Sequence, residues 1–122
     1  QRFQVLPVVE IQPASDWYDY AAKYVTGETE YTVPALLDDG ITKRLQALAL
    51  ETFRCLGAAG FGRVDFRLSP AGLPYVLELN AIPGFTTTSL LPKAARAAGI
   101  EFSELCRRIM ENASVHSVPA SG

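Results

Sequence analysis

One part of the chain combines acidic, amide and arginine side chains at a spacing that suits metal and phosphate chemistry. Arg63 and Asp65 precede a turn-like segment at residues 69–72, and Glu78 and Asn80 follow it. Carboxylate and amide oxygens are the ligands that Mg²⁺ prefers, and arginine binds phosphate or carboxylate through paired hydrogen bonds. These residue types predict a Mg²⁺–phosphate site. The alternative is a surface hairpin in which the arginine pairs with the two acids.

The elements that would position these side chains are the two strands of a β-hairpin. Side chains alternate between the faces of a strand, so Arg63 shares a face with Asp65, and Glu78 shares one with Asn80. If the numbers of each two residues that pair across the strands add up to an odd value, all four side chains lie on one face. The same register gathers apolar side chains opposite them: Val64, Phe66, Leu68, Tyr75, Leu77 and Leu79. An even register would mix acids into the apolar face, so the odd register is predicted.

The loop after the second strand places hydroxyl groups and backbone donors next to this cluster. Pro83 and Gly84 predict a turn, and the residues at 86–89 are threonines and a serine that lead into a helix. Thr88 or Ser89 is the expected N-cap of that helix. A helix N-terminus beside a cation site is suited to hold a carboxylate or a phosphate. An ordinary capped loop is the alternative.

The segment at 13–29 is polar but crowded with aromatic residues, and we expect a loop with one helical turn around residues 20–24. Trp17 and Tyr18 are interpreted as aromatics that cover the core. A lid that excludes water from a reactive intermediate is the functional alternative for this segment.

Hydrophobic periodicity predicts an α+β fold, with a mostly antiparallel sheet packed against helices. Strands are expected at 4–12 and 30–33, and the hairpin at 60–80. Helices are expected at 38–56, 89–98 and 102–112. The first of these helices would bury a stripe made of Leu45, Leu48, Ala49, Thr52 and Leu56, and the last would bury Phe102, Leu105, Cys106 and Ile109.

Length and composition predict one domain at 1–113 with a disordered tail at 114–122. The 122 residues are 48% hydrophobic and carry a net charge of −2. The charge gives no basic patch, so no nucleic-acid partner is expected, and no apolar run reaches membrane-spanning length. Cys55 and Cys106 are interpreted as buried or half-buried free thiols of a reducing compartment, which predicts a cytoplasmic protein.

Three stretches together resemble one enzyme family. The first stretch begins at Trp17 and ends with Lys23 and Tyr24. The second is Gly62-Arg63-Val64-Asp65, and the third is Glu78-Leu79-Asn80-Ala81-Ile82-Pro83-Gly84-Phe85-Thr86. In order and spacing they resemble D-alanine–D-alanine ligases of the ATP-grasp superfamily, from about residue 6 to about residue 109. The resemblance places the chain in the C-terminal ATP-grasp subdomain.

The resemblance implies a role for each matching residue at the metal site. Asp65, Glu78 and Asn80 would hold two Mg²⁺ ions, with Mn²⁺ as an alternative metal, and Glu78 would bridge the ions at the bound nucleotide. Arg63 would stabilise the acyl-phosphate and the tetrahedral intermediate, and the backbone N–H of Gly84 would help to hold that intermediate.

The remaining matches concern the substrates. Ser89 and Leu90 would bind the carboxylate of the second D-alanine. Lys23 would lie near the ATP phosphates, and Tyr24 would belong to a mobile loop that closes over the site, which supports the lid interpretation for these two residues.

The implied reaction joins two D-alanines at the expense of ATP, for peptidoglycan precursor synthesis. ATP phosphorylates one D-alanine, and the amine of the second displaces phosphate. Family members are considerably longer, so the chain is interpreted as a fragment that is inactive without the N-terminal and central domains. Family members are also commonly dimers, which makes a homodimer of the full-length protein a possible assembly. Two alternatives are another ATP-grasp carboxylate–amine or D-alanyl-D-lactate ligase, and a non-catalytic binding domain.

Overall fold

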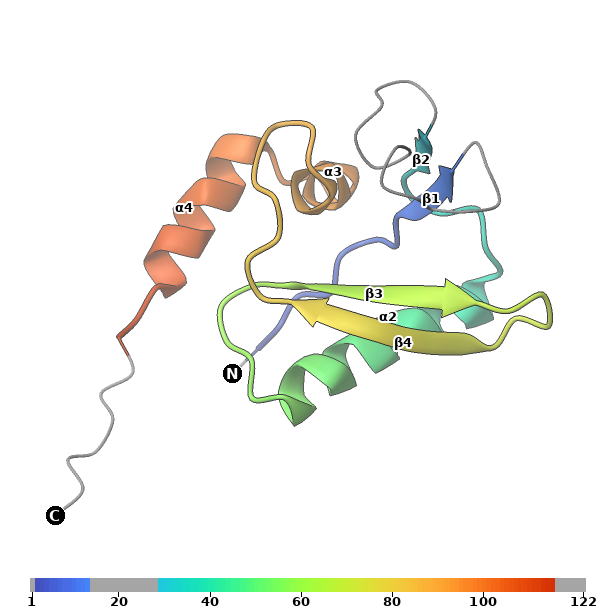
Figure 1. Cartoon of the computed structure of the whole chain (residues 1–122). Helices are drawn as coiled ribbons and strands as arrows, with labels where there is room; N and C mark the ends of the chain where they lie inside the picture. The colour runs from blue at the N-terminus through green and yellow to red at the C-terminus, as the bar shows by residue number, and fades with distance from the viewer. Residues whose placement is uncertain (1, 14–28, 116–122) are drawn as a thin grey trace, which may run out of the picture.

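The computed structural model describes residues 2–13 and 29–115 of the chain. Within these ranges it shows two small antiparallel sheets and three helices, which confirms the predicted α+β class (Figure 1). The elements, in chain order, are β1 (Glu10–Pro13), β2 (Thr29–Thr32), α2 (Asp39–Cys55), β3 (Arg63–Leu68), β4 (Pro74–Asn80), α3 (Leu90–Ala97) and α4 (Phe102–Asn112).

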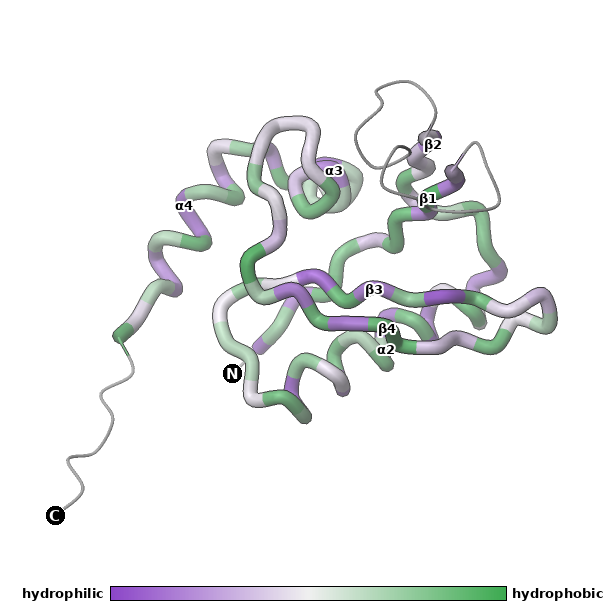
Figure 2. Tube along the Cα trace, in the orientation of Figure 1, coloured by the Kyte–Doolittle hydropathy of each residue, from purple (hydrophilic) through white to green (hydrophobic). Residues whose placement is uncertain are grey.

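The predicted hairpin is formed by β3 and β4, which pair antiparallel. The turn between them is closed by Ser69, whose carbonyl accepts a 2.9 Å hydrogen bond from Gly72 and whose Oγ accepts one of 3.0 Å from the N–H of Leu73. In Figure 2, hydrophilic and hydrophobic residues alternate along the hairpin, as expected for strands with two different faces.

The register of the hairpin is the predicted one in the half that carries the candidate site and differs in the other half. Arg63 pairs with Asn80 and Asp65 with Glu78, both odd sums. The register then shifts, so that Phe66 pairs with Val76. The prediction of an odd register throughout is therefore wrong beyond Asp65.

A β-bulge is the physical reason for this shift, because it places one extra residue in β4 and leaves Leu77 without a directly opposite residue. Tyr75 consequently pairs with Arg67 rather than joining the apolar set, and Tyr75 and Leu77 are 56% and 63% exposed. Alternation alone cannot reveal a bulge, since it assumes one residue per rung.

Helix α2 lies against the hairpin and covers its apolar face (Figure 1). The buried residues of the helix are Leu45 and Phe53. The predicted stripe is confirmed at Leu45 and wrong at Leu56, which is 64% exposed, because the helix ends at Cys55 and the chain turns away at Gly57. Phe53, which the predicted stripe left out, takes its place against the hairpin.

Gly62 allows that close packing of helix and hairpin. A Cβ atom at this position would lie 2.9 Å from Cε2 of Phe53 and 3.2 Å from the carbonyl oxygen of Asn80. Such distances are shorter than van der Waals contact, so only glycine fits immediately before Arg63 without a shift of the neighbours. The glycine thus fixes how closely the first rung of the site approaches α2.

The N-terminal segment is a strand over a shorter range than the predicted 4–12. Only Glu10–Pro13 pairs, with β2, and residues 2–9 carry no regular structure. Their backbone is held by isolated contacts: Gln46 donates a side-chain hydrogen bond of 3.1 Å to the carbonyl of Leu6, and Ala35 donates one of 2.8 Å to Val8. A strand requires a pairing neighbour, and within the described residues β2 ends before it could pair with residues 2–9.

A second core lies where α3 and α4 meet the loop from Gly84. Its buried members are Leu91, Ala95, Ile100 and Leu105. Around them pack Leu6, Phe61, Phe85 and Ile109. The predicted α4 stripe is thereby confirmed, with Leu105 buried and the other three residues half-buried. The rings of Phe85 and Phe102 lie 5.2 Å apart, which joins the loop to α4.

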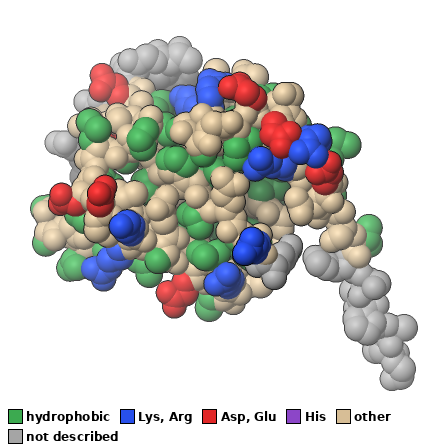
Figure 3. Space-filling model, turned by 180° about the vertical axis from the view of Figure 1, so that it is seen from behind, with side chains coloured by type: hydrophobic (Ala, Val, Ile, Leu, Met, Phe, Trp, Pro, Cys, Tyr) green, Lys and Arg blue, Asp and Glu red, His purple; other side chains and the backbone are tan. Residues whose placement is uncertain are grey.

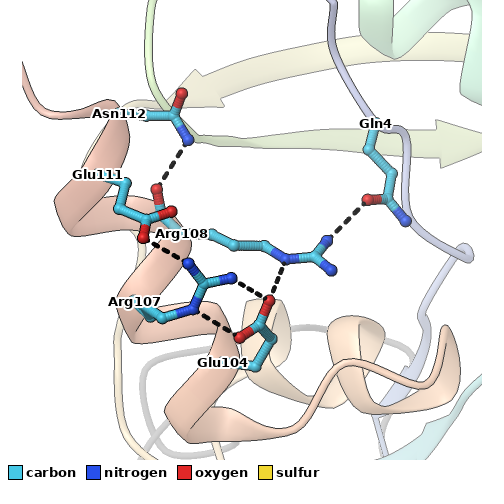
Figure 4. Close-up of polar contacts among 6 residues, drawn as sticks. All are labelled: Gln4, Glu104, Arg107, Arg108, Glu111 and Asn112. Atoms are coloured by element: carbon cyan, nitrogen blue, oxygen red, sulfur yellow. Dashed lines mark hydrogen bonds and ion pairs between the residues drawn. The ribbon is translucent and has the colours of Figure 1, made fainter.

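The outer face of α4 carries a network of charged side chains (Figure 4). The Arg107 guanidinium donates two hydrogen bonds to Glu104, of 2.8 and 2.7 Å, and also pairs with Glu111. Arg108 donates to Glu104 at 2.8 Å and to Gln4 at 3.2 Å, which ties α4 to the N-terminal segment. Seen from behind, acidic and basic side chains lie next to one another near the point where the chain leaves α4 (Figure 3).

This network changes the titration of Glu104. The hydrogen bond from Arg107, followed by that from Arg108, lowers the pKa of Glu104 from 4.5 to about 2. The hydrogen bonds of Arg107 to Glu104 and to Glu111 in turn raise the pKa of Arg107. The carboxylate is therefore charged at every pH at which the protein would function.

The other predictions about the chain have mixed outcomes. Cys106 is half-buried as predicted, whereas Cys55 is exposed because it ends α2 on the side away from the hairpin. Among the described residues, no helix has the length and apolar character needed to cross a membrane. The loop at 14–28 and most of the predicted tail, at 116–122, lie outside the described residues.

Candidate functional site

A hollow of about 360 Å³ lies where the start of β3, the loop after β4, the beginning of α3 and β2 come together. It is lined by Tyr31, Arg63, Gly84, Thr88, Ser89, Leu90 and Lys93. Four of the predicted catalytic and substrate-binding residues are among these, Arg63, Gly84, Ser89 and Leu90, and so is Thr88, a candidate N-cap. The hollow therefore gathers the predicted arginine and the predicted carboxylate-binding residues at one place.

Arg63 is oriented by an ion pair with Asp65. Its Nε lies 2.7 Å from Oδ1 of Asp65 and its Nη2 lies 3.0 Å from Oδ2, so the guanidinium meets the carboxylate edge to edge. The two residues are two positions apart on β3 and share one face of it, which is why the side chains can meet. Both side chains are about 30% exposed, at 28% and 30%. The pair fixes the arginine in a defined position at the hollow.

The other two candidate metal ligands occupy the neighbouring rungs of β4. Glu78 is paired directly with Asp65 and is exposed, and Asn80 is paired with Arg63. Oδ1 of Asn80 accepts a 3.0 Å hydrogen bond from the N–H of Ile82, which begins the turn toward Gly84. Residues paired across two strands carry their side chains on the same face, so Asp65, Glu78 and Asn80 share one side of the hairpin.

These three residues have the chemistry that a hard divalent cation requires. The two carboxylates form one residue pair of the hairpin, and the amide and the arginine form the next pair on the same face. Mg²⁺ takes such oxygens together with those of a substrate phosphate. The Asn80 Oδ1 keeps a second lone pair beside its bond to Ile82. The donor set thus fits Mg²⁺.

The loop from Gly84 to Ser89 is closed on itself by hydrogen bonds. The N–H of Thr86 donates to Oγ of Ser89 at 2.9 Å, and the N–H of Ser89 donates to the carbonyl of Thr86 at 3.0 Å. A Cβ atom at Gly84 would lie 3.3 Å from Oγ of Ser89, so the glycine allows these two residues to approach. The loop therefore presents the Ser89 hydroxyl and the backbone of Gly84 to the same space.

Ser89 is also the residue immediately before α3, as predicted, although its side chain makes no capping bond to the helix. The first N–H groups of a helix have no partner inside the helix, and Pro92 lacks an N–H. Leu90 and Leu91 are the donors that remain in this turn, at the end of the helix that carries partial positive charge. Of these two residues Leu90 lines the hollow, so its N–H is the one placed to meet an anionic group there.

Two residues that the sequence analysis did not single out line the same hollow. Tyr31 comes from β2, and its ring lies 4.1 Å below Nζ of Lys93, measured to the ring centroid. Lys93 follows Ser89 by one helical turn, and its N–H donates to the Ser89 carbonyl at 3.0 Å. The helical spacing from Ser89 to Lys93 was a usable signal, whereas the approach of β2 to α3 was not visible in the sequence.

Lys23 and Tyr24 lie outside the described residues, as does the rest of the predicted lid. Their roles remain predictions from the resemblance. The described part of the site thus contains the predicted arginine, metal ligands and carboxylate-binding residues.

The comparison with protein-family models gives a match to the family described as "D-ala D-ala ligase C-terminus", over residues 1–111. The chain belongs to this family. The resemblance inferred from Arg63, Glu78 and the loop after Asn80 is thereby confirmed.

Relatives of this D-Ala–D-Ala ligase C-terminal family extend the finding. A D-alanine–D-alanine ligase of Anaeromyxobacter sp. (strain Fw109-5) is 46% identical over 112 residues, which are 92% of this chain and 36% of that protein. A crystal structure of the Bacillus anthracis ligase complexed with ATP matches with a TM-score of 0.72 and 38% identity, over 88% of this chain and 35% of that one.

A third relative differs in its named acceptor. The structure of VanG D-Ala:D-Ser ligase from Enterococcus faecalis is 34% identical with a TM-score of 0.74, over 87% of this chain and 31% of that chain. In each comparison the chain spans about a third of the length of its relative.

Proposed function

We propose that the protein containing this chain is an ATP-dependent ligase that joins two D-alanines to D-alanyl-D-alanine through an acyl-phosphate, for peptidoglycan precursor synthesis. The chain supplies the C-terminal part of the ATP-grasp domain, and N-terminal and central domains of the same protein supply the rest. The names of the relatives, including one solved with ATP, support this proposal.

The observation that carries the proposal is the hollow itself. It brings Arg63, Gly84, Ser89 and Leu90 together at the end of the hairpin whose next rungs hold Asp65 and Glu78. An anion-binding hollow that adjoins paired carboxylates is what a reaction between a carboxylate, a phosphate and an amine requires.

Each group has a task that follows from its position. Arg63 opposes the negative charge that develops on the reacting carboxyl and phosphoryl oxygens, and its ion pair with Asp65 keeps it oriented before substrate arrives. The backbone N–H of Gly84 donates to the same developing oxyanion. Ser89 and the N–H of Leu90 hold the carboxylate of the second D-alanine, so that its amine faces the acyl-phosphate.

The cation site completes the proposal. Asp65, Glu78 and Asn80 would hold Mg²⁺, which when bound neutralises phosphate charge. Lys23 and Tyr24 are proposed to contact the phosphates and to close over the site. We place the enzyme in the cytoplasm, and we propose a homodimer, which light scattering of the full-length protein would test.

The deciding experiment measures D-alanine-dependent phosphate release from ATP and Mg²⁺, with the product identified by mass spectrometry. The full-length protein should form D-alanyl-D-alanine, and this chain alone should release no phosphate. Absence of D-alanine-dependent turnover by the full-length protein would refute the proposed substrate.

A second candidate is a ligase with another acceptor, which the likeness to a D-Ala:D-Ser ligase favours. Parallel reactions with D-alanine, D-serine and D-lactate as acceptors separate the candidates, because each product has its own mass. A non-catalytic binding domain would give no product with any of them.

A further inference from the structure

The hollow contains two cationic side chains that differ in how their charge is balanced. Arg63 already meets a carboxylate, Asp65, through two hydrogen bonds. Lys93 forms no ion pair with any acid in the described part of the chain. Among the residues that the structure describes, the lining thus carries a positive charge that no acidic side chain balances, and Lys93 is its source.

The position of Lys93 is defined although none of the described acidic residues pairs with it. Its Nζ lies 4.1 Å from the centroid of the Tyr31 ring, a distance at which an ammonium group is attracted to the ring face. The residue is half-buried, and its backbone belongs to the first turn of α3. A ring does not neutralise an ammonium group, so N–H donors of Lys93 stay available to an anion while the side chain is held in one place.

The charge is also placed where it can act with other donors. Lys93 stands one helical turn after Ser89, and both line the hollow. An acceptor carboxylate beside Ser89 would therefore lie within the field of Lys93, of the α3 N-terminus and of Arg63. Partial burial of the site reduces the screening of these attractions by water.

We infer that Lys93, held against Tyr31, binds the α-carboxylate of the second substrate and sets the affinity of the ligase for it. This inference rests on the proposed ligase function and adds Lys93 and Tyr31 to the residues that recognise the acceptor. Lys93 supplies charge for binding and takes no part in the phosphoryl or acyl transfer.

The test uses the full-length protein with Lys93→Met, which keeps the length of the side chain and removes its charge. The KM for the second D-alanine should rise roughly tenfold with little change in kcat, as expected when a charged hydrogen bond to bound substrate is lost. The KM for ATP should stay as in the unmodified protein. Titration calorimetry of D-alanine into protein loaded with Mg²⁺ and a non-hydrolysable ATP analogue measures the same loss without turnover.

Matched variants separate charge from structure. Lys93→Arg keeps the charge and should restore the acceptor KM to within about threefold of the original, whereas Tyr31→Leu removes only the ring contact and should raise it about threefold. Lys43→Met removes a lysine charge from the exposed face of α2 and should leave the acceptor KM unchanged. Added salt should raise the KM of the unmodified protein more than that of Lys93→Met.

The outcomes distinguish this inference from the proposed function. Product formation by the unmodified protein together with an unchanged acceptor KM in Lys93→Met overturns the inference and leaves the ligase standing. If D-serine or D-lactate proves to be the acceptor, the same shift is expected, since the α-carboxylate is shared. If no such acceptor binds or reacts, both the ligase and the role of Lys93 are wrong.

Discussion

The structure shows one use of the Asp65 carboxylate, which is to orient Arg63. Both oxygens of Asp65 accept hydrogen bonds from Arg63. The arginine–acid pairing that was considered as the alternative to a metal site is therefore present between these two residues. Glu78, on the directly paired rung, is exposed and forms no ion pair with the described residues. The two carboxylates are therefore unequal, because one orients the arginine and the other faces solvent.

Glu78→Gln in the full-length protein should abolish Mg²⁺-dependent nucleotide binding, because a neutral amide replaces an anionic ligand of a divalent cation. Titration calorimetry with a non-hydrolysable ATP analogue, in the presence and absence of Mg²⁺, measures the effect. Glu51→Gln, on the exposed face of α2, serves as the control. Binding that is unchanged in Glu78→Gln would remove Glu78 from the metal site.

At the scale of elements, the helices were predictable and the details of strand pairing were not. Hydrophobic periodicity and capping residues predicted the bounds of all three described helices to within one residue at each end. The turn residues at 69–72 predicted the hairpin. The bulge opposite Phe66 was not predicted, because the alternation argument assumes one residue per strand position. Tyr31 was not predictable as part of the site, since it reaches α3 only through tertiary packing.

Gly62→Ala should destabilise the fold by about 1–3 kcal/mol, the usual cost of forcing extra volume into a packed contact. The added methyl group would lie 2.9 Å from Phe53 and would push α2 away from the hairpin. Urea unfolding of the protein measures the change. The matched control is Gly40→Ala, in the first turn of α2, where no heavy atom lies within 4 Å. Since alanine is the better helix former, this control should be neutral or stabilising.

The charge network of α4 predicts a dependence of stability on pH. Glu104 has a pKa of about 2 in the folded protein and about 4.5 without its partners. Because the folded pKa is the lower one, the stabilisation is fully present above pH 4.5 and is lost as the pH falls through 2. A ¹³C NMR titration of the glutamate carboxyl groups should place Glu104 near 2. The double variant Arg107→Gln with Arg108→Gln should return it toward 4.5, and an unchanged titration would show that the arginines are not the cause.

At the scale of the whole molecule, large apolar side chains remain on the surface of the described part of the chain. Leu36 is 85% exposed, Ile82 is 87% exposed and Leu77 is 63% exposed. They come from the loop before α2, from the loop after β4 and from the bulge. The chain spans about a third of its relatives, and such side chains are suited to contact the remaining domains that we propose.

The isolated chain should therefore bind more of a fluorescent apolar dye, per mole of chain, than the full-length protein does. Replacing Leu77 and Ile82 together by serine should lower dye binding by the isolated chain and weaken its association with the separately produced remainder of the protein. Equal dye binding by the chain and the full-length protein would show that these side chains stay exposed in the whole protein.

The bulge in β4 also has a consequence for how the hairpin tolerates changes in length. The register shifts between Asp65 and Phe66. The residue pairs between this shift and the turn therefore do not determine the pairing of Asp65 with Glu78. The turn at 69–72 could then be lengthened, or a peptide epitope inserted there, without moving the acidic rungs. The hairpin tip is thus a suitable attachment point for a fluorescent label that leaves the pairing of Asp65 with Glu78 in place.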